Sequence, residues 1–196
     1  MAKSVVRREQ YRLRAYRQLG DEASARRLAH DLTAFGQAPE PDRGFRSFIA
    51  VFGGPLDLDE RGFERALWDT LRLVHRADSE PWDPAVSSDP ASSEFSFSVG
   101  GQAFYVVGMH PGASRAARRF ERPLVVFNLH AQFEALREEG RYEKVRDLIR
   151  DRDRALQGSV NPAVKDFGTQ SEARQYAGRD VPAAWRCPFH PDPDAD

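Results

Sequence analysis

The sequence has a single cysteine, Cys187, among its 196 residues. One cysteine excludes an internal disulfide, and it also excludes a zinc site built from several cysteines. We therefore expect a protein of a reducing compartment.

Long apolar runs are also missing. No stretch approaches the roughly 20 consecutive apolar residues that a membrane-spanning helix needs. The basic start, MAKSVVRREQ, lacks the apolar run of a signal peptide. These features predict a cytoplasmic protein that does not bind a membrane.

The sequence has no excess of charge of either sign, because 29 Lys and Arg residues face 30 Asp and Glu residues. This balance argues against a general nucleic-acid binder. Neither the Walker pattern nor the dinucleotide fingerprint occurs, so no nucleotide site is predicted. A hydrophobic fraction of 40% over this length is typical of one globular domain.

The first 36 residues predict a helical arm. Apolar residues are spaced among arginines from residue 4 to residue 35, with a break between two helices at Gly20-Asp21. Gly36 to Gly44 contains two prolines and is typical of a linker, so the domain proper is expected over residues 45–190. The arm is expected to pack on the domain or on a second subunit, which would make a homodimer.

Four short strands are predicted after the linker. Residues 48–52 form an apolar run, residues 95–99 alternate, Gly100-Gly101 predicts a hairpin turn, and residues 102–107 return. Residues 124–127 are fully apolar, which indicates a central strand. Between the first two strands, Asp57 or Asp59 is expected to cap a helix that ends near Ala77.

A further helix is expected after Asn128, weakened at Gly140 and stopped at Gly158. Its apolar stripe is expected to belong to the core, and the stripe consists of Phe133, Leu136, Tyr142, Val145, Leu148, Ile149 and Leu156. These elements predict an α+β fold: a small antiparallel or mixed sheet of about four strands, packing helices, and the helical N-terminal arm.

The stretch from Val106 to Phe133 concentrates residues that bind ligands. It contains His110, His130 and four arginines, at positions 115, 118, 119 and 122. In a helix these arginines would share one face, because they are spaced by three or four residues. A basic face beside two imidazoles favours an anionic ligand.

Six motifs together resemble one family. They are Gly108-Met-His-Pro111, Ser114-Arg115 with Arg118-Arg119-Phe120, Val126-Phe-Asn-Leu-His130 with Gln132-Phe133, Ile149-Arg150 with Arg152-Asp153, Ser171-Glu-Ala173 with Gln175-Tyr176, and Trp185 with Cys187-Pro-Phe189. Over roughly residues 45–190 the sequence resembles the YqcI/YcgG family. Members of this family are implicated in haem-dependent N-hydroxylation of guanidine nitrogens in arginine or arginine-derived compounds.

The resemblance implies haem b as the cofactor. Arg115, Arg118 and Arg119 are then the candidates for binding the two propionates, since guanidinium groups bind carboxylates well. Cys187 is the first candidate for the axial iron ligand, because a thiolate favours cleavage of the O–O bond. His110 is the alternative ligand, and His130 is a third candidate. A lone cysteine beside aromatic residues is also commonly a small buried hydrophobe.

A cationic guanidine substrate implies carboxylates in the site. Glu172 and Asp153 are the candidates, and Tyr176 and Trp185 are expected to line the pocket. Glu172 and His130 are the candidate catalytic residues. The same carboxylates would also suit ordinary ion pairs with neighbouring arginines, and the same aromatic residues would suit a closed core.

The function that we expect is a haem-dependent monooxygenase that N-hydroxylates a guanidine- or amine-bearing small molecule. Dioxygen and an external electron donor or reductase are implied, because no flavin or nicotinamide motif occurs. A haem-binding sensor or carrier without turnover is the alternative. A third class is a cofactor-free interaction protein whose arginine face binds an anionic partner.

Overall fold

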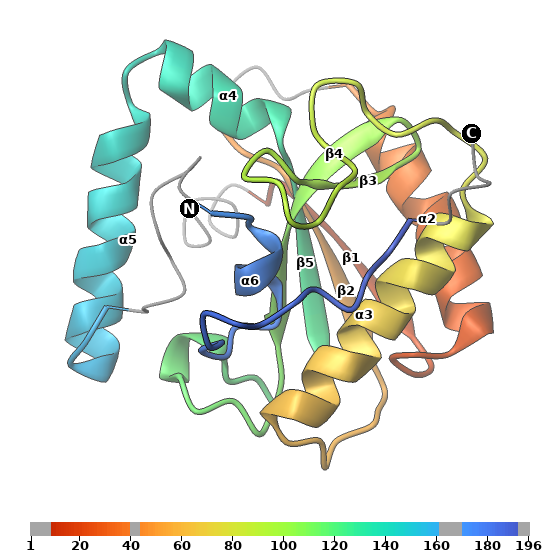
Figure 1. Ribbon diagram of the computed structural model, residues 1–196, viewed down its shortest axis with the longest axis horizontal. Coiled ribbons are helices and arrows are strands. Elements are labelled where there is room, and N and C mark those ends of the chain that lie inside the picture. The colour runs from red at the N-terminus through yellow and green to blue at the C-terminus, as the bar shows by residue number, and fades with distance from the viewer. Residues whose placement is uncertain (1–8, 40–43, 161–169, 192–196) are drawn as a thin grey trace.

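The computed structural model describes residues 9–39, 44–160 and 170–191. They form an α+β fold around one five-stranded mixed sheet in the order β1-β2-β5-β4-β3 (Figure 1). The elements are β1 (Tyr11–Tyr16), α2 (Glu22–Gly36), β2 (Ser47–Phe52), α3 (Glu60–Ala77), β3 (Phe97–Val99), β4 (Gln102–Met109), the 3-10 turn η1 (Ala116–Arg118), β5 (Leu124–Leu129), α4 (Ala131–Glu138), α5 (Tyr142–Gln157) and α6 (Ala173–Tyr176).

The expected fold class is confirmed, but the first half of the arm was assigned wrongly. Residues 11–16 are a strand that pairs in parallel with β2, and only α2 is helical. Tyr11, Leu13 and Ala15 alternate with arginines, and this period of two fits a strand. Pairing with β2 supplies the backbone hydrogen bonds that stabilise it. The arm is therefore part of the sheet and of the core, and no separate unit ends at residue 36.

The centre of the sheet follows the sequence pattern closely. β5 lies between β2 and β4 and is therefore central, as its apolar run predicted, and it is antiparallel to both neighbours. β3 and β4 form the expected hairpin, and Gly100 and Gly101 at its turn have φ angles of +64° and +69°. These angles favour glycine because a Cβ atom would be strained there.

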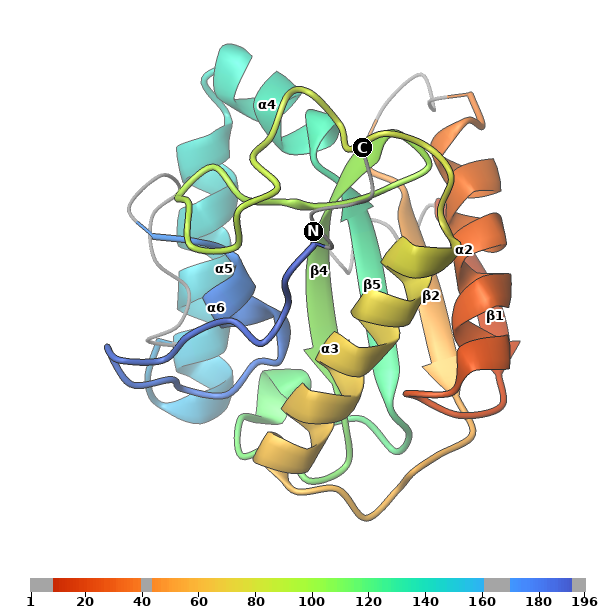
Figure 2. The ribbon, with the colours of Figure 1, turned by 45° about the vertical axis from the view of Figure 1, so that its right-hand side comes forward.

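One face of the sheet carries the main core. Phe48, Phe127 and Phe104 lie side by side across three strands, and each of them is fully buried. Helices α2 and α3 cover this face, and α3 lies across the front of the strands in Figure 2. The buried faces of these helices supply Leu28, Leu32, Phe63, Leu67 and Leu71.

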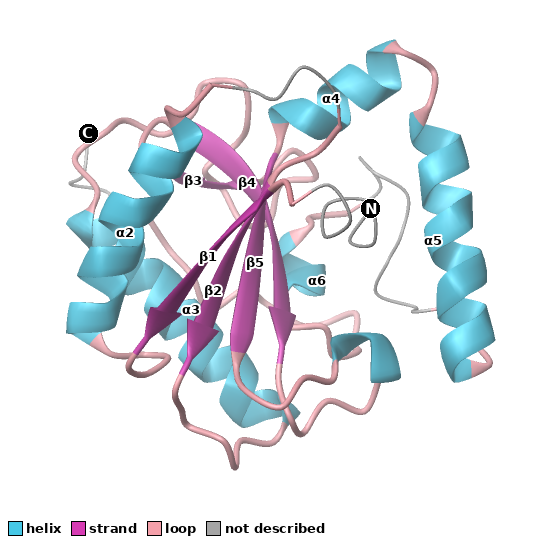
Figure 3. Cartoon of the chain, turned by 180° about the vertical axis from the view of Figure 1, so that it is seen from behind, coloured by secondary structure: helices cyan, strands magenta, loops and turns pink. Residues whose placement is uncertain are grey.

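The opposite face is apolar but much less covered. Leu13, Ile49, Val126 and Val107 are paired neighbours in four adjacent strands, so they form one row across the sheet. Leu13 is 49% exposed, and the other three are half-buried. Figure 3 shows β1, β2 and β5 from this side, and none of the described helices lies over them. We call this surface the open face.

Helices α4 and α5 confirm two predicted breaks and overturn one expectation. Gly140 separates the two helices, and Gly158 ends α5 in the left-handed conformation with φ +77°. The apolar stripe of α5 was expected in the core, yet α5 has no buried residue. Leu148, Ile149 and Leu156 are 46%, 37% and 59% exposed.

Two irregular segments are held in place by specific contacts. In the loop after α3, the Trp82 ring packs against Phe95, Phe97 and Phe189. The segment 170–191 returns along the edge of the sheet and includes α6. The part of the tail at 161–169, with Asn161-Pro162 and Gly168, lies outside the described residues. Among the described helices, none combines the length and apolar character needed to cross a membrane.

The start of α3 gives a direct test of the fold. Asp59 caps the helix by accepting a hydrogen bond from the Gly62 N–H at 2.6 Å, whereas Asp57 is exposed and does not cap it. We predict that Asp59→Ala lowers the free energy of unfolding by about 0.5–2 kcal/mol. In urea titrations, Asp57→Ala should change it by less than about 0.5 kcal/mol. Equal losses in the two variants would contradict the assignment of the cap.

Candidate functional site

The outer edge of β4 is where the motif residues of the tail meet those of the central stretch. β3 pairs with β4 only as far as Phe104, so the edge beyond it has no strand partner among the described residues. Arg118 takes part of this place by donating to the Gly108 carbonyl at 3.1 Å and to the Gln175 carbonyl at 3.3 Å. Helix α6 is thereby fixed along the edge.

Glu172 lies buried at this edge, with 6% of its surface exposed. The Ser96 hydroxyl donates to its Oε1 at 2.7 Å, and the Tyr176 hydroxyl donates to the same oxygen. None of the ion pairs among the described residues involves Glu172. Burial therefore raises the pKa of Glu172 to about 8, although both hydroxyls act against this rise.

Tyr105 and Gln175 extend this group toward the open face. The Tyr105 hydroxyl donates to Gln175 Oε1 at 2.6 Å, and the phenol ring lies edge-on to Tyr176. Burial raises the pKa of Tyr105, whereas the positive charge of Arg118 lowers it. We call these residues the Tyr105 cluster, and it consists of Ser96, Tyr105, Arg118, Glu172, Gln175 and Tyr176.

The four arginines do not share a helical face, so that expectation was wrong. η1 spans only residues 116–118, and Arg115 and Arg119 on either side of it are extended. Arg118 is buried in the Tyr105 cluster, whereas Arg119 donates to the Ala113 carbonyl at 3.1 Å and Arg122 to the Gly53 carbonyl at 3.3 Å. Each of these three guanidinium groups donates to different backbone carbonyls, so they do not form one basic face.

Arg115 and Asp153 form an ion pair with each other. Arg115 Nη2 lies 2.8 Å from Asp153 Oδ2, and both side chains are 12% exposed. Arg115 also donates to the Ser159 carbonyl at 2.7 Å. This pair joins η1 to α5, so Asp153 has the structural partner that was the alternative to a substrate role.

The two histidines lie at opposite ends of the sheet and do not meet. His110 follows β4 and His130 follows β5, and these strands are antiparallel. His110 is 1% exposed and stacks on Phe63 with the ring centroids 4.3 Å apart. Burial lowers its pKa, and its buried Nδ1 has no hydrogen-bond partner among the described residues.

His130 lies at the end of the sheet where the Tyr105 side chain is found. Its N–H donates to the Ala103 carbonyl, and Asn128, two residues earlier, pairs with Tyr105. His130 Nε2 lies 2.9 Å from Glu134 Oε1. Burial lowers the pKa of His130 below its ordinary value of 6.5, so its imidazole is neutral at pH 7.

Cys187 lies in the core that packs against α3. It is 9% exposed, and the backbone of Phe189 hydrogen-bonds its sulfur. Burial raises the pKa of the thiol to about 12, so the folded chain holds it as a thiol at neutral pH. The structure does not bring Cys187 together with the arginines of η1.

The sequence model of the YqcI/YcgG family matches residues 1–190. The chain belongs to the YqcI/YcgG family. The match includes the first 44 residues, which the sequence motifs did not cover, and this agrees with the place of β1 and α2 in the fold. No curated protein and no solved structure matches the chain.

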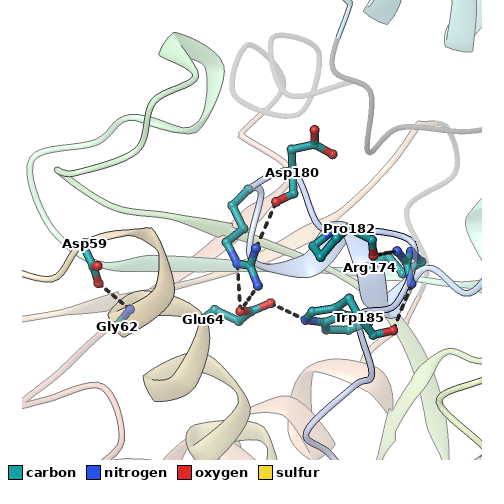
Figure 4. Close-up of polar contacts among 8 residues, drawn as sticks. Asp59, Gly62, Glu64, Arg174, Asp180, Pro182 and Trp185 are labelled. Atoms are coloured by element: carbon teal, nitrogen blue, oxygen red, sulfur yellow. Dashed lines mark hydrogen bonds and ion pairs between the residues drawn. The ribbon is translucent and has the colours of Figure 1, made fainter.

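Trp185 of this YqcI/YcgG protein lies beside α3 and holds the tail to that helix (Figure 4). Its indole N–H donates to Glu64 Oε1 at 3.0 Å, and Arg179 donates twice to Glu64 Oε2, at 2.8 and 2.6 Å. Arg174 donates to the carbonyls of Trp185 and Pro182. These contacts satisfy the buried Glu64 carboxylate, and they give Trp185 a structural role.

Several members of the site were missed by sequence reasoning. Ser96 and Tyr105 belong to the predicted hairpin, and nothing in their spacing indicated contacts with residues 172–176. Gln175 had a signal, since it occurs in the family motif with Tyr176. In the described part of the chain, no group of three or more His, Cys, Asp or Glu side chains is placed to hold a metal ion.

The raised pKa of Glu172 predicts how stability depends on pH. Between its ordinary value of 4.5 and about 8, the folded protein keeps a proton that the unfolded chain releases. Stability should therefore fall as the pH rises through this range. His110 and His130 have lowered pKa values and act in the opposite sense, mainly below 6.5.

We predict that the wild type loses about 1 kcal/mol more than Glu172→Gln when the pH rises from about 7 to 8. Urea unfolding at both pH values measures the difference. The glutamine variant is the matched control, because it keeps an acceptor for Ser96 and Tyr176 and cannot ionise. Parallel losses in the two proteins would show that the carboxyl group titrates as it does in the unfolded chain.

Proposed function

We propose that this protein is a cytoplasmic haem-dependent monooxygenase that N-hydroxylates an arginine-like molecule bearing a guanidine or amine group. Membership of the YqcI/YcgG family over residues 1–190 supports the activity. The buried carboxyl of Glu172, which takes part in no ion pair among the described residues, supports a cationic substrate. This carboxyl is the observation that carries the proposal.

Glu172 would recognise the substrate by its charge. A buried carboxyl that takes part in no ion pair among the described residues is costly to ionise, as its raised pKa indicates, and a guanidinium group would supply a paired positive charge. Binding would then lower the pKa of Glu172 and release a proton at neutral pH. Tyr176 and Ser96 hold Oε1 in place, which leaves recognition to the other side of the carboxylate.

The haem candidates of the sequence do not lie together in the structure. Cys187 is a buried thiol on the α3 side, and His110 is buried and stacks on Phe63 of α3. Neither residue fits an iron ligand in this conformation. His130 would therefore be the residue that holds the iron, since its neutral imidazole is the form that binds iron and its ring is oriented by Glu134.

The propionates would be bound by arginines near β4. Arg118 is a buried cation bonded to two carbonyl groups, and no ion pair among the described residues includes it. An anionic group beside Arg118 would balance its charge. Arg115 comes just before η1 and pairs with Asp153, whereas Arg119 is exposed and remains the weaker candidate. When bound, haem supplies the activation of dioxygen, with electrons from an external reductase.

The proposal predicts a specific loss of chemistry in one variant. Purified protein supplied with hemin, a reductant, labelled dioxygen and an arginine-like compound should give a product with one labelled oxygen atom, detected by mass spectrometry. Glu172→Gln should bind hemin normally and lose more than about 90% of this product, because the substrate cation loses its carboxylate, an effect of about 1.4 kcal/mol or more.

Glu121→Gln is the matched control, because Glu121 is exposed and lies outside the Tyr105 cluster. This variant should retain full product formation. Normal hemin binding without product in the wild type would favour a haem sensor or carrier. Protein that stays colourless with excess hemin would remove the haem assignment and leave an interaction protein.

A further inference from the structure

The two oxygens of the Glu172 carboxyl have different surroundings. Oε1 accepts hydrogen bonds from the Ser96 hydroxyl at 2.7 Å and from the Tyr176 hydroxyl. Oε2 accepts no hydrogen bond from the described residues. Because a carboxylate oxygen has about two lone-pair positions, the two hydroxyls fill those of Oε1. Only Oε2 can accept a further donor.

Oε2 is open to solvent, although only 6% of the surface of Glu172 is exposed. In the described part of the chain, the fully enclosed side-chain atoms that lack a hydrogen bond belong to other residues, such as Trp68 and His110. Oε2 lacks a hydrogen bond and is not one of these enclosed atoms, so part of its surface reaches solvent. A small cationic group can therefore approach this oxygen.

The nearby cations of the chain have other partners. Arg137 lowers the pKa of Glu172 through its positive charge, but it forms its ion pair with Glu134. Arg118, in the Tyr105 cluster, donates to two backbone carbonyls. The position at Glu172 Oε2 is therefore left for a cation from outside the described chain.

Guanidinium and ammonium groups make different demands on a carboxylate. A guanidinium group is planar and binds most strongly through two parallel N–H donors, one to each carboxylate oxygen. Both oxygens must then have a free position, and Oε1 of Glu172 has none. An ammonium group is a compact charge, and a single carboxylate oxygen is enough to bind it. The hydrogen bonds from Ser96 and Tyr176 therefore favour an ammonium group.

We propose that the substrate presents a primary ammonium group, and not a guanidinium group, to Oε2 of Glu172. This inference rests on the proposed function and chooses between the two head groups that it allows. Ser96 and Tyr176 act as positioning residues, because their bonds to Oε1 convert a carboxylate that could bind two parallel donors into one that binds a charge end-on. Ser96 then determines specificity, since removal of its hydroxyl frees a position on Oε1.

Nα-acetyl-L-lysine and Nα-acetyl-L-arginine are suitable probes, because they differ in the side-chain head group and neither has a free α-amino group. Isothermal titration calorimetry of the purified protein measures both dissociation constants. The wild type should bind the lysine compound at least about fivefold more tightly than the arginine compound. Glu172→Gln should weaken binding of the lysine compound at least about tenfold, because the paired negative charge is lost.

Ser96→Ala should shift the preference toward the arginine compound. Without the Ser96 hydroxyl, Oε1 can accept one donor of a guanidinium group while Oε2 accepts the other, so the ratio of the two dissociation constants should change at least about threefold. Ser98→Ala is the matched control, because Ser98 lies two residues further on and accepts from the Asp83 N–H. This variant should keep the preference of the wild type. Urea unfolding checks that both variants are folded.

The outcomes separate this inference from the proposed function. Tighter binding of the arginine compound by the wild type, lost in Glu172→Gln, would overturn the ammonium assignment and keep Glu172 as the cation site. If neither compound binds, or if Glu172→Gln binds both as the wild type does, then the assignment and the recognition role of Glu172 are both wrong. A folded Ser96→Ala variant with an unchanged preference would overturn the role of Ser96.

Discussion

The antiparallel pairing of β4 with β5 is the constraint on which the arrangement of the functional residues depends. It sends His110 and His130 to opposite ends of the sheet, although both belong to one short stretch of sequence. It also places Asn128 beside Tyr105, and thereby brings His130 toward the Tyr105 cluster. A group that binds both histidines is excluded by this pairing, because six residues of strand span about 20 Å.

Packing on one face of the sheet supplies most of the core. On one face, α2 and α3 bury the phenylalanine row, and the tail is bound to α3 through Glu64. Cys187 and Trp185 belong to this side, where burial and hydrogen bonds explain them fully. At the outer edge of β4 lie ionisable groups that the fold leaves without ion pairs among the described residues, namely Glu172 and Arg118. Buried ionisable groups of this kind are costly to charge unless a ligand pairs with them.

Local patterns in the sequence predicted the elements better than their contacts. The hairpin at Gly100-Gly101, the central strand and the breaks at Gly140 and Gly158 were all identified, because each depends on a few neighbouring residues. β1 was mistaken for a helix, since a six-residue alternation was hidden in a longer helical spacing. The surroundings of Glu172 could not be predicted, because Ser96 is 76 residues away in the sequence and only the β3 register brings it close.

The absorption spectrum of the hemin-loaded protein, reduced under carbon monoxide, tests most directly whether the chemistry lies on the open side of the sheet. The proposed arrangement predicts a Soret band at a position typical of histidine ligation, retained in Cys187→Ala and lost or shifted in His130→Ala. A band shifted far to the red, as a thiolate ligand gives, that disappears in Cys187→Ala would contradict it and place the iron on the α3 side.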